Sequence, residues 1–160
     1  MDEVEQRLLA IEQRMRAAED ELAIIRLIAS YGPLIDCGSM ERGPALFASD
    51  GVYDLSYGRT TGPDAFADLL RGPEHHALLA QGVAHVMGLP WVRVNGDDAI
   101  ATNTTQLFLR EPDGYSIFRV AQNVWKLKRQ DDGQWLIAER FNRLIGDDTD
   151  ARDLLVAAIG

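Results

Sequence analysis

Three turn sequences in the second half of the chain constrain its fold more than any other feature. Asn95-Gly96, Asp113-Gly114 and Asp132-Gly133 each separate two segments rich in apolar and β-branched residues. Asn-Gly and Asp-Gly favour the tight turns that join antiparallel strands, because these residues accept a left-handed backbone. We therefore predict a meander of antiparallel strands at residues 91–95, 99–109, 116–128 and 134–144. A further strand at 83–87 would precede them after a bend or bulge.

The first 31 residues predict one long helix. Apolar side chains recur in steps of four and three, as in a heptad seam: Val4, Leu8, Ile11, Met15, Ala18, Leu22 and Ile25. A helix of about 30 residues is ~45 Å long, more than a domain of this size can cover. We expect its first half to pack on another subunit and its second half, from Leu22, to join the core. The alternative is that the helix folds back on its own domain.

The segments between the long helix and the strands are shorter. Gly32-Pro33 interrupts the helix, whose last turn would reach Asp36 before a stop at Gly38. We then expect a short helix at 44–48, a strand at 51–57, a helix at 62–70 and a polar run at 72–76 that includes His75 and His76. At the end of the chain, residues 146–150 offer an N-cap to a helix at 152–159.

Helices first and a sheet afterwards predict an α+β domain. We divide the chain into a helical extension for oligomerisation (1–21), the domain itself (22–146) and a helical tail (147–160). With 160 residues, 46% of them hydrophobic, the chain is long enough for one domain with a substantial core.

The charge and cysteine content exclude several classes of function. A net charge of −9 argues against nucleic-acid and anionic-membrane partners, which require basic patches. No apolar run is long enough to span a membrane and no signal peptide is evident, so we expect a cytoplasmic protein. Cys37 is the single cysteine, which excludes an internal disulfide. The sequence holds no phosphate loop, nucleophile elbow or dinucleotide fingerprint.

His85 is the most informative candidate for chemistry. It lies in the uncharged stretch 81–89. A buried imidazole in such a stretch needs a hydrogen-bond partner, because an unpaired buried polar group costs ~1–3 kcal/mol. One interpretation is a core histidine bonded to a backbone carbonyl. The other is a catalytic base with a carboxylate partner, for which Asp36 is the candidate. A carboxylate that accepts one ring N–H fixes the imidazole tautomer and stabilises the imidazolium.

This layout, with Tyr31, Asp36, His85 and the turn Asp132-Gly133-Gln134-Trp135, resembles the SnoaL-like branch of the NTF2-like superfamily over residues 20–146. The resemblance implies a cone, in which a curved mixed or antiparallel sheet wraps around N-terminal helices and leaves an apolar pocket at its open end. Several dehydratase-like members, including scytalone dehydratase and the bile-acid dehydratases, carry an Asp at the end of the first long helix and a His on the first long strand. Asp36 and His85 match those positions, and Tyr31 matches a Tyr of the bile-acid dehydratases.

Two departures from these relatives leave the substrate open. No histidine follows His85, whereas scytalone dehydratase has a second catalytic His on a neighbouring strand. Bile-acid dehydratases use a further acid on the next strand, where this chain has Asn103, Thr105 and Gln106.

The resemblance implies a cofactor-independent lyase of the dehydratase type, or an isomerase, acting on a hydrophobic cyclic molecule of polyketide, steroid or aromatic character. His85 would abstract a proton, Asp36 would orient it, and Tyr31 would assist the departing or accumulating oxygen. Residues five apart on an ideal helix point about 140° apart. Tyr31 and Asp36 would therefore face one pocket only if the Gly32-Pro33 kink reorients the last turn.

Further side chains are candidates for binding the substrate: Tyr53, Tyr57, Trp91, Asn103, Asn123 and Arg143. Tryptophans are more simply core or pocket wall. Arg140 or Arg143 could bind an anionic or carbonyl group, with at least one of the two facing solvent. We expect no metal, because Asp36 and His85 supply two ligands where catalytic zinc takes three, and no other cofactor.

A second hypothesis from a different class is a non-catalytic module that binds a small molecule or drives assembly. In either case the expected partners are a hydrophobic small-molecule ligand and further copies of the chain, as a trimer or a dimer. The two hypotheses differ at His85, which a catalytic site needs open to a cavity and hydrogen-bonded to Asp36.

Overall fold

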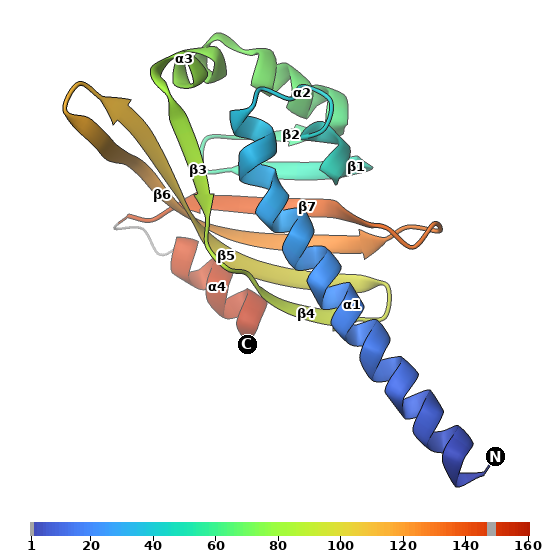
Figure 1. Ribbon diagram of the computed structural model, residues 1–160. Helices are drawn as coiled ribbons and strands as arrows, with labels where there is room; N and C mark the ends of the chain where they lie inside the picture. The colour runs from blue at the N-terminus through green and yellow to red at the C-terminus, as the bar shows by residue number, and fades with distance from the viewer. Residues whose placement is uncertain (1, 147–149) are drawn as a thin grey trace.

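The computed structural model describes residues 2–146 and 150–160, which form an α+β domain (Figure 1). The helical elements are α1 (Glu3–Asp36), the 3-10 turn η1 (Pro44–Leu46), α2 (Pro63–Arg71), α3 (Pro73–Gln81) and α4 (Asp150–Ile159). The strands are β1 (Phe47–Leu55), β2 (Gly58–Thr61), β3 (Val83–Met87), β4 (Trp91–Asn95), β5 (Asp98–Glu111), β6 (Gly114–Arg129) and β7 (Trp135–Leu144). The predicted α+β architecture, with a long N-terminal helix and a curved mixed sheet, is confirmed.

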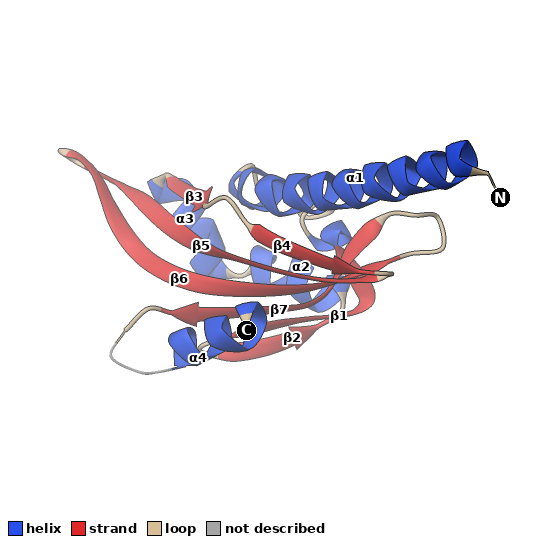
Figure 2. Ribbon diagram, turned by 90° about the horizontal axis from the view of Figure 1, so that it is seen from below, coloured by secondary structure: helices blue, strands red, loops and turns tan. Residues whose placement is uncertain are grey.

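The seven strands form one sheet in the order β2-β1-β7-β6-β5-β3, with β4 also paired to β5. Helix α1 lies on one side of this sheet and α4 on the other (Figure 2). Helices α2 and α3 gather near the C-terminal end of α1 (Figure 1). The inner side of the sheet is therefore covered by the C-terminal half of α1, and by α2 and α3 at one end, which is where a cavity can form.

The predicted meander from β4 to β7 is confirmed, because each of these strands pairs antiparallel with the next. Strand β1 does not belong to the meander: it pairs parallel with β7, with Tyr53 beside Arg140. A parallel pair needs a long crossover, here the whole chain from β2 to β6, and no local pattern announces such a partner. Strand β1 also begins at Phe47, so the short helix expected at 44–48 ends at Leu46.

Two further elements differ from expectation. Strand β2, which forms a hairpin with β1, was not predicted. The segment expected as a polar run belongs to helix α3, which begins at Pro73 and ends at Gln81, where Gly82 caps it with φ +98°. Proline fits the first position of a helix and glycine its C-terminal cap, and these two signals define α3. The predicted tail helix is confirmed as α4, whereas its expected N-cap falls largely on residues 147–149, outside the described residues.

Helix α1 begins with a capping box and runs without interruption past Pro33. The Glu5 backbone N–H donates to the Asp2 carboxylate at 2.8 Å, and the Asp2 N–H donates to the Glu5 carboxylate at 2.9 Å. These contacts satisfy two backbone donors that the first turn of a helix leaves without partners. The helix ends at Asp36, followed by Gly38 with φ +69°, where the sequence predicted its stop.

An ion pair anchors the middle of α1 to the end of the sheet. The Asp20 carboxylate accepts two hydrogen bonds from Arg129, both 2.6 Å, and a third from the Trp135 indole at 3.2 Å. The Arg129 guanidinium lies 4.5 Å from the centroid of the Trp135 ring. Hydrogen bonding to Arg129 lowers the pKa of Asp20 below its ordinary value of 3.8. This contact fixes the point at which α1 leaves the domain.

We expect Asp20→Asn to lower the free energy of unfolding by about 1–2 kcal/mol at neutral pH, because it removes the charge from a bidentate pair. A lowered carboxylate pKa contributes stability that is present above the unfolded value of 3.8 and is lost as pH falls through the folded pKa. The difference between the two proteins, measured by urea unfolding, should therefore shrink at about pH 3. Asp98→Asn is the control, since the exposed Asp98 lies 3.9 Å from Lys128. Equal effects of the two substitutions would contradict this role for Asp20.

Candidate active site

Asp36 and His85 meet where the end of α1 crosses strand β3. His85 Nδ1 lies 2.5 Å from Asp36 Oδ1, and the His85 backbone N–H donates to Asp36 Oδ2 at 2.7 Å. The carboxylate thus holds both the ring and the main chain of His85, and both side chains are largely shielded from solvent. An ionised carboxylate only accepts hydrogen bonds, so Nδ1 carries its proton and Nε2 remains as the nitrogen that can take one.

Gly32 permits this contact. A Cβ atom on Gly32 would collide with the carbonyl oxygen of His85 and lie 3.3 Å from both His85 Cβ and Met87 Cγ. Only glycine therefore lets the backbone of α1 approach β3 closely enough for Asp36, one turn later, to reach His85. The sequence predicted an interruption at Gly32-Pro33, but the helix is continuous there and Gly32 serves the close approach to β3.

His85 lines a cavity of about 290 Å³ at the end of the sheet covered by α2 and α3. Its walls are mostly apolar and aromatic: Tyr31, Ile35, Tyr53, Leu55, Tyr57, Phe66, Leu69, Leu70, Glu74, His75, Leu78, His85, Leu107, Phe118 and Arg119. A recess of about 40 Å³ shares five of these residues (Tyr31, Tyr53, His85, Leu107 and Arg119). The recess adds Thr105, Ala121, Arg140 and Asn142 to the lining. Asp36 lines neither the cavity nor the recess, and its link to them is its hydrogen bond to His85.

Arg140 is the buried cation of the recess, 2% exposed, whereas Arg119, which also lines the recess, is only partly buried. Its Nε and Nη2 donate to Asn123 Oδ1 at 3.1 and 2.8 Å. Its guanidinium carbon lies 4.1 Å from the ring centroid of Tyr31, 4.6 Å from that of Tyr53 and 4.3 Å from that of Trp125. Among the described residues, no group hydrogen-bonds its Nη1 and no carboxylate pairs with it. A buried cation without an anion is costly unless a ligand supplies one.

Two tyrosines stand beside this cation. Burial raises the pKa of Tyr31 well above its ordinary value of 10.0, against the opposing effect of the Arg140 charge. Burial raises the pKa of Tyr53 in the same way. Both hydroxyls therefore stay protonated at neutral pH and are able to donate hydrogen bonds into the recess.

His75 is a cavity residue that the sequence did not single out. It sits on α3, is buried, and its Nε2 has no hydrogen-bond partner among the described residues. Burial lowers the pKa of His75, and the nearby His85 lowers it further. The helix signals at Pro73 and Gly82 could have identified it. Adjacent residues of a helix point about 100° apart, so a predicted helix would have placed His75 and the exposed His76 on different faces.

We expect the protein to lose stability as pH falls below about 6.5, in part through His75. Its folded pKa is lowered, so the unfolded chain binds the proton more readily, and the stability present above the unfolded value is lost as pH falls through the folded one. His75→Phe should flatten the decline in melting temperature between mildly alkaline and mildly acidic buffer. His76→Phe, at an exposed site, should leave the decline unchanged. If the melting temperatures of wild type and His75→Phe declined in parallel with pH, His75 would not contribute to the loss of stability.

Four of the six candidate binding residues lie at or behind the cavity, and one of them, Tyr53, lines both the cavity and the recess. Tyr57 is at its rim, where its hydroxyl accepts a hydrogen bond from Arg119 at 3.0 Å. Asn103 and Asn123 are buried behind the recess rather than in its lining. Asn103 accepts a hydrogen bond from the Trp125 indole at 2.9 Å, and Asn123 holds Arg140. Asn123 therefore positions Arg140 in the recess, and Asn103 positions Trp125, whose ring lies against the Arg140 guanidinium.

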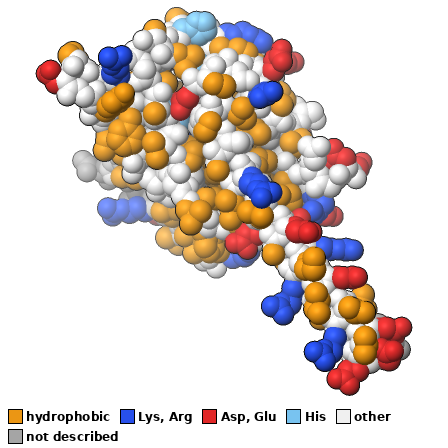
Figure 3. Space-filling model, in the orientation of Figure 1, with side chains coloured by type: hydrophobic (Ala, Val, Ile, Leu, Met, Phe, Trp, Pro, Cys, Tyr) orange, Lys and Arg blue, Asp and Glu red, His pale blue; other side chains and the backbone are white. Residues whose placement is uncertain are grey.

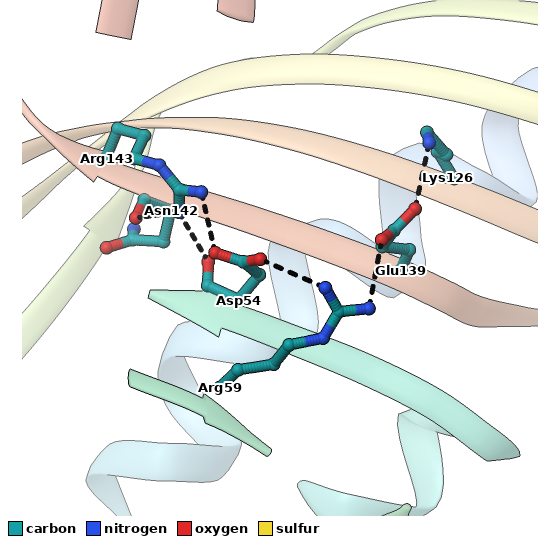
Figure 4. Close-up of polar contacts among 6 residues, drawn as sticks. All are labelled: Asp54, Arg59, Lys126, Glu139, Asn142 and Arg143. Atoms are coloured by element: carbon teal, nitrogen blue, oxygen red, sulfur yellow. Dashed lines mark hydrogen bonds and ion pairs between the residues drawn. The ribbon is translucent and has the colours of Figure 1, made fainter. Parts of the chain in front are cut away.

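Trp91 and Arg143, also candidates for binding the substrate, lie away from the cavity. Trp91 is partly exposed on β4 beside Arg93. Arg143 faces the outer side of the sheet, where it contacts Asp54 at 2.6 Å (Figure 4). In the same cluster Arg59 and Lys126 contact Glu139, the latter at 2.8 Å. Neither Trp91 nor Arg143 lines the inner cavity or its recess.

A β-bulge explains why Arg140, and not Arg143, reaches the recess. The pairing of β6 with β7 shifts by one residue between Lys126 and Leu127, opposite Ala138. Strict alternation from the buried Trp135 and Ile137 would point Arg143 inward, and the extra residue reverses the faces beyond it. Arg140 and Asn142 are buried as a result.

A second hollow of about 560 Å³ lies on the outer face of the sheet. Its lining includes the exposed charged residues Arg93, Asp98, Lys126 and Lys128, together with the partly buried Glu139. None of the residues of the Asp36–His85 pair or the recess lines it. We therefore assign the candidate active site to the inner cavity.

Comparisons with known proteins agree with this fold. The profile of the SnoaL-like domain matches residues 16–141. An NTF2-like protein with a cystatin-like fold from Novosphingobium aromaticivorans is 36% identical, with a TM-score of 0.89 over 92% of this chain and 96% of that one. No curated protein matches the chain in sequence.

More distant structures share the fold alone. A provisionally named scytalone dehydratase from Novosphingobium aromaticivorans is 21% identical, with a TM-score of 0.67 over 81% of this chain and 87% of that one. A Catenulispora acidiphila protein in complex with S-DNPA is 20% identical, with a TM-score of 0.69 over 88% and 98%. Among the described residues, no helix has the length and apolar character needed to cross a membrane. On the strength of the profile match and of the 36% identical relative, the chain belongs to the SnoaL-like domain family, with an NTF2-like fold.

Proposed function

We propose that this protein is a cofactor-independent lyase that removes water from a hydrophobic, cyclic carbonyl compound. The observation that carries the proposal is that a carboxylate-held histidine, His85, and a buried cation with an unpaired donor, Arg140, line the same recess. Proton abstraction next to a carbonyl requires a base for the proton and a hydrogen-bond donor for the negative charge that develops on the carbonyl oxygen.

His85 is the base in this proposal. Asp36 holds Nδ1–H, so Nε2 accepts the proton and the carboxylate stabilises the imidazolium that results. Asp36 does not line the cavity, so its role is to position His85 rather than to touch the substrate. A base held in this way typically contributes about 10²–10⁴-fold to the rate.

Arg140 binds the carbonyl oxygen. When the C–H bond breaks, its electron pair moves onto that oxygen, and Arg140 Nη1 is the unpaired donor that meets the negative charge. The three aromatic rings around the guanidinium keep water away and strengthen the interaction. This arrangement also accounts for the burial of a cation without a carboxylate.

Tyr31 assists the leaving group. The enolate returns its electron pair to form a carbon–carbon double bond, and the neighbouring C–O bond breaks to release the β-hydroxyl group. Tyr31, protonated because burial raises its pKa, donates a hydrogen bond to the departing oxygen. The proton taken by His85 then completes the water molecule, so the base is restored and no cofactor is consumed.

The relatives support this proposal in general terms. The SnoaL-like family includes isomerases and dehydratases. One structural neighbour carries the name of scytalone dehydratase, and another was solved with a small molecule, S-DNPA. The mostly apolar cavity of about 290 Å³ suits a small cyclic ligand.

The test is a panel of cyclic β-hydroxy ketones incubated with the protein in D₂O. Loss of water is followed by the absorbance of the conjugated enone, and exchange of the carbon-bound hydrogen is followed by NMR. We expect wild type to catalyse both and Arg140→Met to slow both. Arg143→Met is the matched control, because it changes the same residue type on the same strand outside the cavity. A panel compound that binds without exchange or elimination would instead favour the non-catalytic binding module.

A further inference from the structure

The N-terminal half of α1 extends beyond the body of the protein (Figure 1). Every residue from 2 to 19 is exposed, and Asp20 is the first that is partly shielded. Isolated helices of this length are marginal in water, and most helical stability comes from packing of an apolar face. The capping box at Asp2 supports the first turn only, so the rest of this segment needs a partner.

The apolar seam on this segment faces away from the protein's own sheet. Leu22 is 45% exposed, whereas Ile24 is fully buried against the core. Residues two apart on a helix point about 200° apart, so the seam and the core-facing side are nearly opposite. The remaining exposed members of the seam are Val4, Leu8, Ile11, Met15 and Ala18. Figure 3 shows hydrophobic side chains along the projecting helix. The helix therefore does not fold its seam back on its own domain.

Charged residues flank this seam in a regular order. With Leu8, Met15 and Leu22 at heptad position a, the g positions are Arg7, Arg14 and Glu21, and the e positions five residues later are Glu12, Glu19 and Arg26. Each g residue is opposite in charge to the e residue five places on. Among the described residues, none of these six side chains takes part in an ion pair within the chain.

This order selects a parallel partner of the same sequence. In a parallel, in-register coiled coil, each g residue meets the e residue five places later on the neighbouring helix, so all three pairs attract. In an antiparallel pair, g meets g and e meets e, which brings Arg7 or Arg14 near arginine and Glu12 or Glu19 near glutamate in most registers. A helix of another sequence would need to match this order by chance.

We infer that residues 4–25 form a parallel coiled coil with other copies of this chain, and that this seam is the assembly surface of the protein. Leucine at position a combined with isoleucine at position d, as at Leu8 and Ile11, favours bundles of more than two helices. The domains would then extend from the C-terminal end of the bundle, with their core-facing sides of α1 turned outward. The inference does not depend on the proposed reaction.

Two neighbouring leucines provide the first test. Leu8 is in the seam and Leu9 is beside it, and they are 55% and 45% exposed. We expect light scattering of the full-length protein to give a mass above that of a dimer, and Leu8→Glu to reduce it. Leu9→Glu should keep the wild-type mass. A wild-type mass of one chain, or an unchanged mass in Leu8→Glu, would overturn the inference, and a dimer would overturn the part that rests on leucine and isoleucine.

A charge exchange tests the parallel orientation. Arg7→Glu with Arg14→Glu, or Glu12→Arg with Glu19→Arg, turns two attractive pairs on each helix into repulsive ones and should weaken association on the order of tenfold or more. All four substitutions in one chain restore opposite charges and should restore association. Far-UV circular dichroism and melting of the domain confirm that each variant folds. Association that neither pair of substitutions weakens would overturn the parallel arrangement.

Discussion

Gly32→Val should lower the free energy of unfolding by about 3 kcal/mol, the largest stability effect that we expect from a single substitution in this chain. Any side chain at this position meets the His85 carbonyl oxygen, a backbone atom that cannot move without breaking the pairing of β3 with β5. In an ordinary helix, replacing glycine with a residue that has a side chain improves helix propensity. A large loss at Gly32 would therefore report the close approach of α1 to β3.

Urea unfolding followed by tryptophan fluorescence measures this effect. Ala29→Val, one turn earlier and exposed on the same helix, is the matched control and should change stability by only ~0.5 kcal/mol. It introduces the same β-branched side chain without a clash. Losses of similar size in the two variants would show that the cost comes from placing a β-branched residue in the helix, and not from the close approach of the helix to β3.

Asp36→Asn and His85→Gln should each reduce turnover of a substrate found with the ketone panel by about 10²–10⁴-fold. The loss in His85→Gln is that of the base itself. In Asp36→Asn, the amide oxygen can still accept the His85 backbone N–H, but the amide nitrogen donates to the ring. The imidazole then carries its proton on Nε2, which is the wrong tautomer for a base, so kcat should fall while KM stays close to wild type.

The double variant separates a positioning role from an independent one. If Asp36 acts only through His85, Asp36→Asn should add little to the loss already caused by His85→Gln. His76→Gln, on the exposed side of α3, should keep wild-type turnover. Turnover that survives His85→Gln in a folded protein would contradict the proposed mechanism, and multiplicative losses would contradict the positioning role of Asp36.

Much of the local structure followed from short-range signals. The three Gly turns place β4 to β7, and their glycines adopt φ of +63°, +147° and +85° at Gly96, Gly114 and Gly133. The seam and the stop at Gly38 place α1. Helix α3 was missed although its Pro and Gly signals were present, because the polar residues between them obscured the periodicity. The contact between Asp36 and His85 was expected from the family resemblance, since 49 residues separate the two.

The identity of the cation in the site could not be predicted. Arg140 and Arg143 lie three residues apart on one strand, and alternation favoured Arg143. One bulge reverses the two faces, and neither Ala138 nor Glu139 carries a residue signal for it. The buried Arg140 and its support by Asn123 became visible only when the pairing of β6 with β7 was known.

The sequence by itself determined the long first helix, the meander of strands with its turns, the heptad seam with its charges, and the single histidine of the predicted strands. These features depend on periodicity and turn residues within about a dozen positions. Only the tertiary structure decided that β1 runs parallel to β7, that α3 brings His75 to the cavity, and that Arg140 points into the recess. The reason is that strand partners and bulges are set by packing between distant segments, and a shift of one residue exchanges the two faces of a strand.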